Sequence, residues 1–512
     1  MRLRATASTA EGAAPSHREP APGHSPVPGW AWVLCWAVLA AGIGLLVRLP
    51  GPATLDPDEH AAVLYLDRLS AGERLEEPLL SSSKPLLTVV HGLTWQAAHD
   101  WRLLEALTVA VFALAVVCLA RAAGRLGGLP AAAATVLAVA GSGPLVLQAA
   151  RGNSMVFAIA GWAVALDALT RERDAGPAWA LAAGALFLAG LARAESWLLL
   201  PLAAGYGLLA WRRGERRAVV LVLPLAAPLL WLAHDWLLTG DPLFAVRVPG
   251  RYSDLVSGRQ VVSPADWLAL VARRYVADPL LLALAAAGAV WLWRRRAWVW
   301  LAGLGAAGIG VLALLGLQAW QGTYISWRYF DPADVALRLA AALGAAALAT
   351  WAAGRLRRGS GAAAVAGAML LVGAACWPLA PADPVVDSTL DRDTRLSANT
   401  ATAIDALRPV AAEPGTVLVV SGPQRLRVAV ELGLPLDRVR DLFLAARAAP
   451  LDRALTGSDA VFHDADGDRP PERFGRLSTT TSTRVGEVEL APLWTDPGRG
   501  LYVLRVVGAE SH

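Results

Sequence analysis

Residues 54–87, TLDPDEHAAVLYLDRLSAGERLEEPLLSSSKPLL, follow the first long apolar run of this chain. The stretch is too polar to span a bilayer and too apolar to be disordered. It begins with the carboxylates Asp56, Asp58 and Glu59 and ends with Lys84, the only lysine in the sequence. We therefore expect an ordered segment at the membrane surface that gathers charged side chains.

Two helices are predicted within and just after this stretch. Apolar residues recur at helical spacing after Asp58 and predict a helix from Asp58 to Ala71 that ends near Gly72. The sequence KPLLTVVHGLTW, residues 84–95, predicts a second helix, because Pro85 is tolerated in a first turn.

Lys84 is unusual because every other basic residue of this chain is an arginine. A lone lysine indicates a position that needs a compact ammonium with three donors rather than a planar guanidinium. Such an ammonium is a common phosphate ligand. The alternative is a lysine whose stem lies along apolar surface while its charge reaches water.

The composition is that of a membrane protein. The chain has 512 residues, of which 55% are hydrophobic. Long runs of Ala, Leu, Val and Gly predict about eleven spans of about 20 residues each, preceded by a disordered cytoplasmic tail over residues 1–29. The first span is expected from Trp30 to Val47. The other spans are expected to begin near Leu103, Ala131, Ser154, Ala178, Trp197, Ala218, Pro279, Ala297, Ala333 and Gly361.

Arginine clusters orient these spans because they fall in alternate loops. The positive-inside rule places these loops and the N-terminus in the cytoplasm, and it places the C-terminus outside. The clusters are Arg121 and Arg125, Arg171 and Arg173, Arg212 to Arg217, Arg294 to Arg296, and Arg355 to Arg358. The outward loops then hold residues 54–87, 148–154, 191–196, 234–278 and 318–332, in which the remaining polar motifs lie.

Several classes of function are disfavoured. The formal net charge of +4 comes without a continuous basic face, so no nucleic acid is expected as a partner. Cys35, Cys118 and Cys376 all lie inside apolar runs, so neither a disulfide nor a cysteine metal cluster is expected.

Residues 379–512 are more polar and predict a small extracytoplasmic α/β domain, while residues 30–378 form the membrane domain. Strands are expected within residues 415–422, 458–467 and 501–507, and helices or turns at 425–433 and 450–457. The sequence HDADGD (His463 to Asp468) offers oxygen ligands for a divalent cation, or a solvated acidic turn. We expect this domain to guide an acceptor rather than perform chemistry.

Short motifs in this order resemble the C-type integral membrane glycosyltransferases, and within them the protein O-mannosyltransferases and aminoarabinose transferases. Residues 56–73 are similar to the first-loop motif PDE…Y…G, with Asp58, Glu59, Tyr65 and Gly72 at the matching positions. SKPLL (83–87) is similar to the Lys-Pro-Pro-Leu segment of that superfamily, with Leu86 in place of the second proline. RYFDP (328–332) resembles a late RY…P motif.

The resemblance implies a mainly α-helical transmembrane bundle that transfers a sugar from a polyprenyl-phosphate donor with inversion. It assigns Asp58 as the general base and Glu59 as its helper. Inverting transfer needs a base on one face of the anomeric carbon and a cation for the leaving phosphate on the other. Lys84 is the first choice for that cation, and Arg328 is the second.

Further outward residues are candidates for substrate binding. They are Tyr65, Arg151 of QAARGNS, Arg193 and Glu195 of LARAES, and Tyr329. An interfacial ion pair is the alternative for Arg193 and Glu195. Asn153 stands where relatives often carry an acidic residue, so no metal ligand is assigned and a divalent cation stays an open alternative.

The implied partners are a polyprenyl-phosphate-linked sugar, membrane lipid, and an acceptor that is a glycan, a lipid or a protein. The implied location is the cell (plasma or inner) membrane. Two other classes remain open. A transporter would need charged or broken segments at mid-membrane. A non-catalytic scaffold would use the outer domain to bind a partner.

Overall fold

The computed structural model describes most of the chain after the first apolar run. The described residues are 57–75, 83–171, 178–248, 263–276, 278–321, 327–355, 361–376, 384–421, 424–442, 445, 450–465, 477–478 and 480–507. The expected cytoplasmic tail and the expected first span from Trp30 to Val47 lie outside this set.

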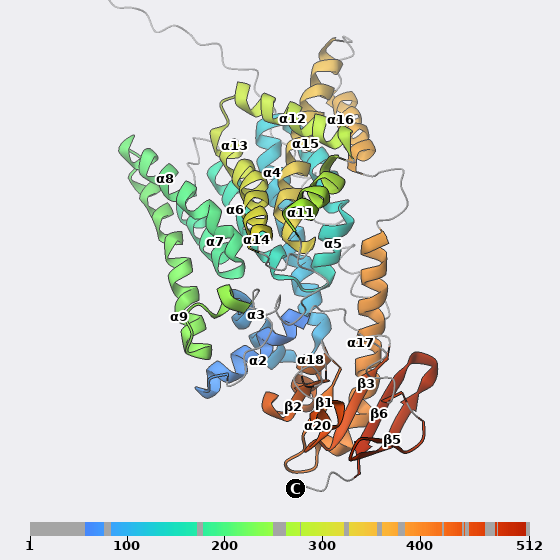
Figure 1. The fold of residues 1–512 in the computed structure, drawn as a ribbon. Coiled ribbons are helices and arrows are strands. Elements are labelled where there is room, and N and C mark those ends of the chain that lie inside the picture. The colour runs from blue at the N-terminus through green and yellow to red at the C-terminus, as the bar shows by residue number, and fades with distance from the viewer. Residues whose placement is uncertain are drawn as a thin grey trace, which may run out of the picture.

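The two helices predicted around the opening stretch are confirmed. Helix α2 runs over Pro57–Ala71, and Gly72 ends it with a φ of 69°, a left-handed conformation that glycine adopts without strain. Helix α3 runs over Pro85–Ala98, with Lys84 at its N-cap and Pro85 in its first turn. The two helices pack on each other at one end of the bundle (Figure 1).

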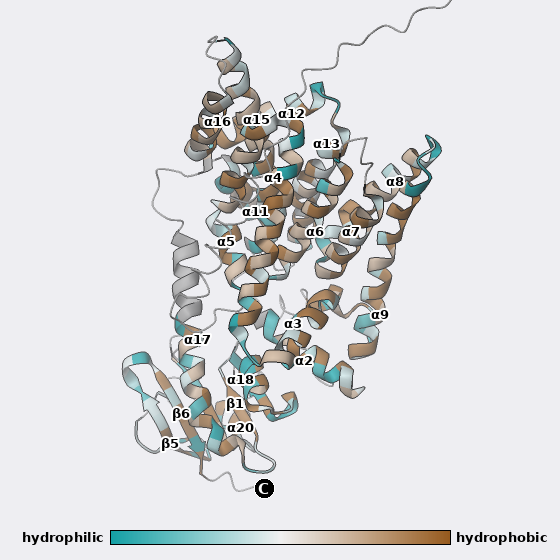
Figure 2. Cartoon of the chain, turned by 180° about the vertical axis from the view of Figure 1, so that it is seen from behind, coloured by the Kyte–Doolittle hydropathy of each residue, from teal (hydrophilic) through white to brown (hydrophobic). Residues whose placement is uncertain are grey.

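A bundle of mostly apolar helices forms the main body. The helices are α4 (Trp101–Ala140), α5 (Gly143–Ala150), α6 (Ser154–Leu169), α7 (Trp179–Ala192), α8 (Leu199–Arg212), α9 (Ala227–Thr239), α11 (Pro264–Val271), α12 (Pro279–Arg294), α13 (Trp298–Gly305), α14 (Val311–Trp320), α15 (Asp331–Arg355) and α16 (Gly361–Cys376). The largest core cluster joins α4, α6, α12, α15 and α16. Apolar residues run along these helices, and polar residues gather at their ends (Figure 2).

The polytopic helical bundle is confirmed, with fewer span-length helices than the eleven spans expected. In the described ranges four helices are long and apolar enough to cross a membrane, and two bent helix pairs raise the number to six. One reason is that several apolar helices are short, such as α7 with 14 residues. Another is that α4 joins two expected spans across a break at Gly128, whose φ is 68°.

The arginine loops meet at the end of the bundle opposite α2 and α3. Asp167, near the end of α6, lies 2.9 Å from Arg125 and 3.6 Å from Arg121. Its second oxygen lies 3.9 Å from Arg171. Arg295, in the loop between α12 and α13, donates a 2.7 Å hydrogen bond to the carbonyl oxygen of Leu126. Arg121 and Arg125 lie within α4 rather than in the expected loop. Arg171 follows α6, and Arg295 follows α12. Arginines of three separate segments are therefore gathered at one end of the molecule.

The prediction of one long loop from His234 to Asp278 is wrong for two parts of that range. Residues 234–239 and 264–276 are helical. Helix α9 continues through Thr239 and ends at Gly240, whose φ is 76°. The polar Asp235 is accommodated in this helix because it accepts hydrogen bonds from the hydroxyl of Ser83 and, at 2.9 Å, from the amide of Ala245. Helix α11 and the turn Ala272–Val276 make much of the second half helical.

The C-terminal part is an α/β unit, as predicted. Helix α17 (Pro384–Ala411) leads into a six-stranded sheet with the order β2-β1-β3-β6-β5-β4. The strands are β1 (Leu418–Val420), β2 (Val439–Asp441), β3 (Ala460–Asp464), β4 (Thr483–Val485), β5 (Val488–Asp496) and β6 (Leu501–Val506). β1 pairs in parallel with β2 and β3, and the other pairs are antiparallel. All three expected strands are present, and α18 (Arg425–Leu432) and α20 (Leu451–Leu455) occupy the two segments expected to be helices or turns.

The start of the HDADGD stretch is buried, which differs from a solvated turn. His463 and Asp464 end strand β3 and are 1% and 0% exposed. Asp464 accepts a 3.2 Å hydrogen bond from the amide nitrogen of Asn399. Residues 466–468 lie outside the described set, so the cation alternative at this stretch stays a prediction.

The C-terminal unit is docked on the first loop of the membrane bundle (Figure 1). The indole nitrogen of Trp101, at the start of α4, donates a 2.8 Å hydrogen bond to Glu431 of α18. Val430 packs on an apolar cluster that includes Val63 of α2 and Trp95 of α3. A change in this unit can therefore reach the helix that carries Asp58 and Glu59.

The contact between α12 and α15 is the closest backbone approach among the glycines of the bundle. A Cβ added at Gly288 of α12 would lie 1.9 Å from the carbonyl oxygen of Ala340 in α15. A Cβ added at Gly344 would lie 2.0 Å from the carbonyl oxygen of Leu284. Small residues of this kind let helices pack closely in membranes, where van der Waals contact drives association.

We predict that Gly288→Ala lowers the unfolding temperature, because the added methyl forces α12 and α15 apart and overpacking costs about 1–3 kcal/mol. Gly303→Ala is the matched control, since a Cβ at Gly303 meets no atom within 4 Å. The control should unfold at the wild-type temperature or slightly above it, because alanine favours helix. Thermal unfolding of the purified proteins in one detergent compares them, and equal temperatures for both variants would contradict the packing described here.

Candidate functional site

Glu59, Lys84 and His91 form a buried charged cluster between α2 and α3. Glu59 lies in the first turn of α2 and is 0% exposed. The Nζ atom of Lys84 lies 3.9 Å from one of its carboxylate oxygens. The Nδ1 atom of His91 lies 3.0 Å from the other, without hydrogen-bond geometry. Lys84 and His91 are two turns apart along α3, so both reach the same carboxylate.

Lys84 is 4% exposed. A lysine that only lies along apolar surface keeps its ammonium in water, and the burial of Lys84 differs from that arrangement. Burial of an ammonium is unfavourable unless an anion accompanies it. Glu59 is such an anion, so the first loop holds a desolvated cation beside a desolvated carboxylate.

The structure describes only the backbone of Asp58, which lies in the first turn of α2. Its role as general base therefore stays a prediction. Glu59, the predicted helper, has one carboxylate oxygen near Lys84 and the other near His91.

Arg193 and Glu195 form a second buried charged group, where α7 ends and the short helix η1 (Ala194–Leu198) begins. Arg193 donates two hydrogen bonds to the Glu195 carboxylate, at 3.1 and 2.5 Å, and one to the hydroxyl of Ser154 at 3.2 Å. Burial alone would raise the pKa of Glu195, but the adjacent Arg193 guanidinium outweighs it and holds that pKa below its usual range. The pair is buried and bidentate rather than an exposed interfacial pair.

The two charged groups are neighbours. The positive charge of Lys84 also contributes to the lowered pKa of Glu195. Lys84 therefore faces Glu59 on one side and lies within electrostatic range of Glu195 on the other. Three separate segments of the sequence are brought together in this way, because Ser154 is the first residue of α6.

Arg328 and Tyr329 belong to the short helix η5 (Trp327–Phe330), immediately before α15. The guanidinium carbon of Arg193 lies 5.4 Å from the centre of the Tyr329 ring. The guanidinium carbon of Arg328 lies 5.9 Å from the centre of the same ring. Tyr329 therefore lies against both arginines, and the predicted residues Arg193, Glu195, Arg328 and Tyr329 share one site.

Arg151 and Tyr65 lie in different surroundings. Arg151 follows α5 at the same outward turn that places Asn153 at the N-cap of α6, and it is 6% exposed. Tyr65 is 1% exposed and packs in an apolar cluster that joins α2 to the C-terminal unit. Tyr65 thus lies where α2 meets that unit, while its role in substrate binding stays a prediction.

Buried polar atoms without hydrogen bonds gather around these groups. In the part of the chain that the structure describes, they include the carboxylate oxygens of Glu59 and Asp331, both ring nitrogens of His91, the hydroxyl of Thr88 and the side-chain amide of Gln148. Buried polar groups in folded proteins almost always have partners. A polar ligand with several donors and acceptors would supply them.

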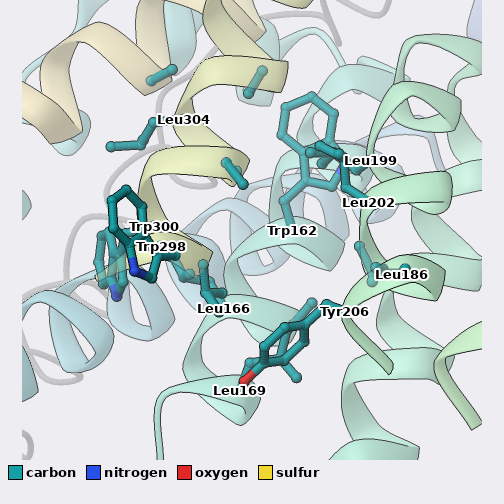
Figure 3. Close-up of a pocket in the computed structure, with 18 of the residues that line it drawn as sticks. Trp162, Leu166, Leu169, Leu186, Leu199, Leu202, Tyr206, Trp298, Trp300 and Leu304 are labelled. Carbon is teal, nitrogen blue, oxygen red and sulfur yellow. The ribbon is translucent and has the colours of Figure 1, made fainter. Parts of the chain in front are cut away.

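An apolar cavity of about 430 Å³ lies among the helices of the bundle (Figure 3). Leu166, Leu186, Leu199, Tyr206 and Leu304 are among the residues that line it. The cavity is tied to the polar site through Trp162, another lining residue, whose indole nitrogen donates a 3.0 Å hydrogen bond to the hydroxyl of Ser196, next to Glu195. A ligand with a polar head and a long apolar chain fits this arrangement.

Sequence reasoning missed His91 and Asp331. His91 lies within the quoted helix 84–95, two turns after Lys84, and that spacing was the available signal. Asp331 is the acidic residue inside RYFDP, directly before the apolar run of α15. An acid at the start of a span indicates function by default.

No metal-binding group was found within the described ranges. No three or more His, Cys, Asp or Glu side chains in those ranges are arranged to hold an ion. The charged groups of the site are instead paired as acid with base, as in Glu59 with Lys84 and Glu195 with Arg193.

Comparison with known proteins supports the fold. No family model matches the sequence, and no curated protein does. The structure is similar to the crystal structure of ArnT from Cupriavidus metallidurans bound to undecaprenyl phosphate, with a TM-score of 0.50, 15% identity, and coverage of 94% of this chain and 98% of that one. The chain therefore has the fold of the C-type integral membrane glycosyltransferases, which confirms the resemblance expected from the motifs.

We predict that Glu195→Gln destabilises the protein by about 3–5 kcal/mol at neutral pH, because it leaves the buried Arg193 without its counter-ion. Since folding lowers the pKa of Glu195, this difference is fully present above its ordinary pKa of 4.5. The difference shrinks as the pH falls below that value, because the unfolded chain then binds the proton more readily.

Thermal unfolding between about pH 7 and pH 3.5 measures this difference, with the exposed Glu215→Gln as the matched control. The control should differ little from wild type at any pH. A difference for Glu195→Gln that persists unchanged through the acidic range would show that Glu195 is not the ionised partner of Arg193.

Proposed function

We propose that this protein is a membrane glycosyltransferase that transfers a sugar from a polyprenyl-phosphate donor to an extracytoplasmic acceptor. One observation carries the proposal: the buried Arg193 is paired with Glu195, and the adjacent Ser196 is hydrogen-bonded to Trp162, which lines an apolar cavity. A lipid phosphate has the matching chemistry, because it joins an anion to a long hydrocarbon chain.

Lys84 and Arg328 are assigned to the donor phosphate. A desolvated cation attracts a phosphate far more strongly than an exposed one, because little water screens the charge. Arg193 lies against the same tyrosine ring as Arg328, and it supports the positive field although its own hydrogen bonds go to Glu195 and Ser154. The isoprenoid chain would occupy the cavity lined by Trp162 and Leu199 (Figure 3). The structurally similar ArnT was crystallised with undecaprenyl phosphate.

The reaction is a displacement at the anomeric carbon. The acceptor oxygen forms a bond to that carbon, the bond from the carbon to the phosphate oxygen breaks, and the polyprenyl phosphate leaves with the electron pair. Asp58 is assigned to take the proton of the acceptor hydroxyl. Lys84 and Arg328 stabilise the charge on the leaving phosphate. Attack and departure on opposite faces invert the anomeric centre.

Glu59 is proposed to orient the site rather than to accept the proton. Its carboxylate is buried between Lys84 and His91, so its negative charge is already compensated. Glu59 would therefore fix the ammonium of Lys84 for the phosphate, while the neighbouring Asp58 deprotonates the acceptor.

The proposed orientation places the site on the outer face of the membrane. It rests on the arginine loops, which the positive-inside rule assigns to the cytoplasm, and which lie at the end opposite α2 and α3. The N-terminus is then cytoplasmic and the C-terminal unit is extracytoplasmic. We assign to that unit the guidance of the acceptor, because it packs directly on α2.

We predict that Lys84→Gln weakens binding of undecaprenyl phosphate by about 10- to 100-fold, since a hydrogen bond to a charged group contributes about 1.5–3 kcal/mol. Lys84→Arg should also lose affinity, because the planar guanidinium is larger and misplaces the phosphate. Arg213→Lys, an exposed swap in an arginine loop, is the matched control and should bind normally. Affinity is measured for purified protein in nanodiscs, and wild-type affinity in both Lys84 variants would remove the phosphate role.

We predict that Asp58→Asn lowers transfer by about 100-fold or more, because it removes the base but keeps the shape of the side chain. Binding of undecaprenyl phosphate should be unchanged. Asp67→Asn, an exposed substitution on the same helix, is the matched control and should retain activity. Transfer is followed in membranes with radiolabelled polyprenyl-phosphate sugars, and full activity in Asp58→Asn would favour a scaffold without chemistry.

A further inference from the structure

Asp331, the first residue of α15, is a buried carboxylate that lacks donors. It is 0% exposed, and neither of its side-chain oxygens accepts a hydrogen bond from any described residue. A buried charge in a folded protein is normally paired and hydrogen-bonded. Asp331 is therefore a polar group whose position calls for a partner from outside the chain.

Two cations near Asp331 direct their hydrogen bonds elsewhere. Arg193 donates to Glu195 and Ser154. Arg274 donates from two nitrogens to the carboxylate of Asp334. The charges of Asp334, Arg274, Arg193 and Arg328 all reach Asp331 electrostatically. Neither Arg193 nor Arg274 donates a hydrogen bond to Asp331, so its two oxygens are left for the donors of a ligand.

The helix that carries Asp331 also lines the apolar cavity. Val335 lies one turn after Asp331 and Leu339 lies two turns after it, on the same face of α15, and both line the cavity. Asp331 is thus at the polar end of the cavity, beside the arginines of the proposed phosphate site. Whatever group it binds must be adjacent to the head of a lipid held in that cavity.

We propose that Asp331 binds hydroxyl groups of the sugar that the donor lipid carries. This inference rests on the proposed function. Both side-chain oxygens of Asp331 lack donors, so the matching ligand is the part of the head group that donates hydrogen bonds. The sugar is attached directly to the phosphate and presents several hydroxyls, each of which donates. A buried carboxylate that two hydroxyls satisfy also rejects a donor that lacks them, because the carboxylate is then left unpaired.

Binding to purified full-length protein in nanodiscs tests the proposal, with undecaprenyl phosphate compared against undecaprenyl phosphates bearing mannose, glucose, galactose or a pentose. Wild type should bind at least one sugar-bearing lipid at least tenfold more tightly than the bare phosphate lipid. Asp331→Asn should lose that gain and keep its affinity for undecaprenyl phosphate. A matched measurement on wild type uses deoxy analogues of the preferred sugar, and removal of at least one hydroxyl should weaken binding about tenfold.

The other possible outcomes contradict either the sugar role of Asp331 or the proposed function. The sugar role of Asp331 is wrong if Asp331→Asn keeps the gain from the sugar, or if it weakens both lipids equally. It is also wrong if wild type binds no sugar-bearing lipid better than the bare one, although the phosphate site then stands. If Asp331→Asn fails to fold, the deoxy series on wild type decides, and tolerance of every deoxy sugar overturns the inference. A wild type that binds no polyprenyl phosphate overturns the proposed function itself.

Discussion

The burial of charge at one end of an apolar helix bundle is the constraint on which this structure depends. Arg193 and Glu195 are both largely removed from water. Burying either charge without the other would be strongly unfavourable, and the two hydrogen bonds between them offset the cost of desolvation. Glu59 and Lys84 repeat this arrangement between α2 and α3. The compensation is incomplete, because Glu59 and Asp331 keep oxygens without hydrogen bonds from the described residues. Such a site can form new hydrogen bonds with a polar ligand, whereas a network whose polar groups are all paired cannot.

The rest of the fold holds these charges in place. The glycine contact between α12 and α15 fixes the helix that begins with Asp331. The C-terminal unit packs through Val430 on a cluster that includes Val63 of α2, and its Glu431 accepts a hydrogen bond from Trp101 of α4, so it supports the helix that carries Glu59. Charged residues placed on packed helices lose little order when a ligand arrives, and preorganised charge is the main source of stabilisation for a leaving group. The apolar cavity adds a position for a hydrocarbon chain next to that charge.

Local signals in the sequence predicted much of this arrangement. Gly72 and Pro85 predicted where α2 ends and α3 begins, because both residues restrict the backbone directly. Lys84 was predicted as a site residue because it is the only lysine of the chain, and Glu59 because it belongs to the first-loop motif. Arg193 and Glu195 were predicted because they lie in an expected outward loop. Pairings between distant segments, such as Arg274 with Asp334, could not be read, since periodicity carries no information on contacts across the bundle. His91 was overlooked although its spacing from Lys84 places both on one face of the predicted helix. Helix α9 extends further than expected because Asp235 finds buried partners.

The central claim is that a lipid phosphate binds between the buried Lys84 of the first loop and the half-buried Arg328 of η5. An experimental structure of the purified protein in nanodiscs with undecaprenyl phosphate tests it most directly. The account predicts density for the phosphate within hydrogen-bond distance of Lys84 or Arg328, with the isoprenoid chain along Trp162 and Leu199. Phosphate density at the opposite end of the bundle, beside Arg121 and Arg125, would contradict the account.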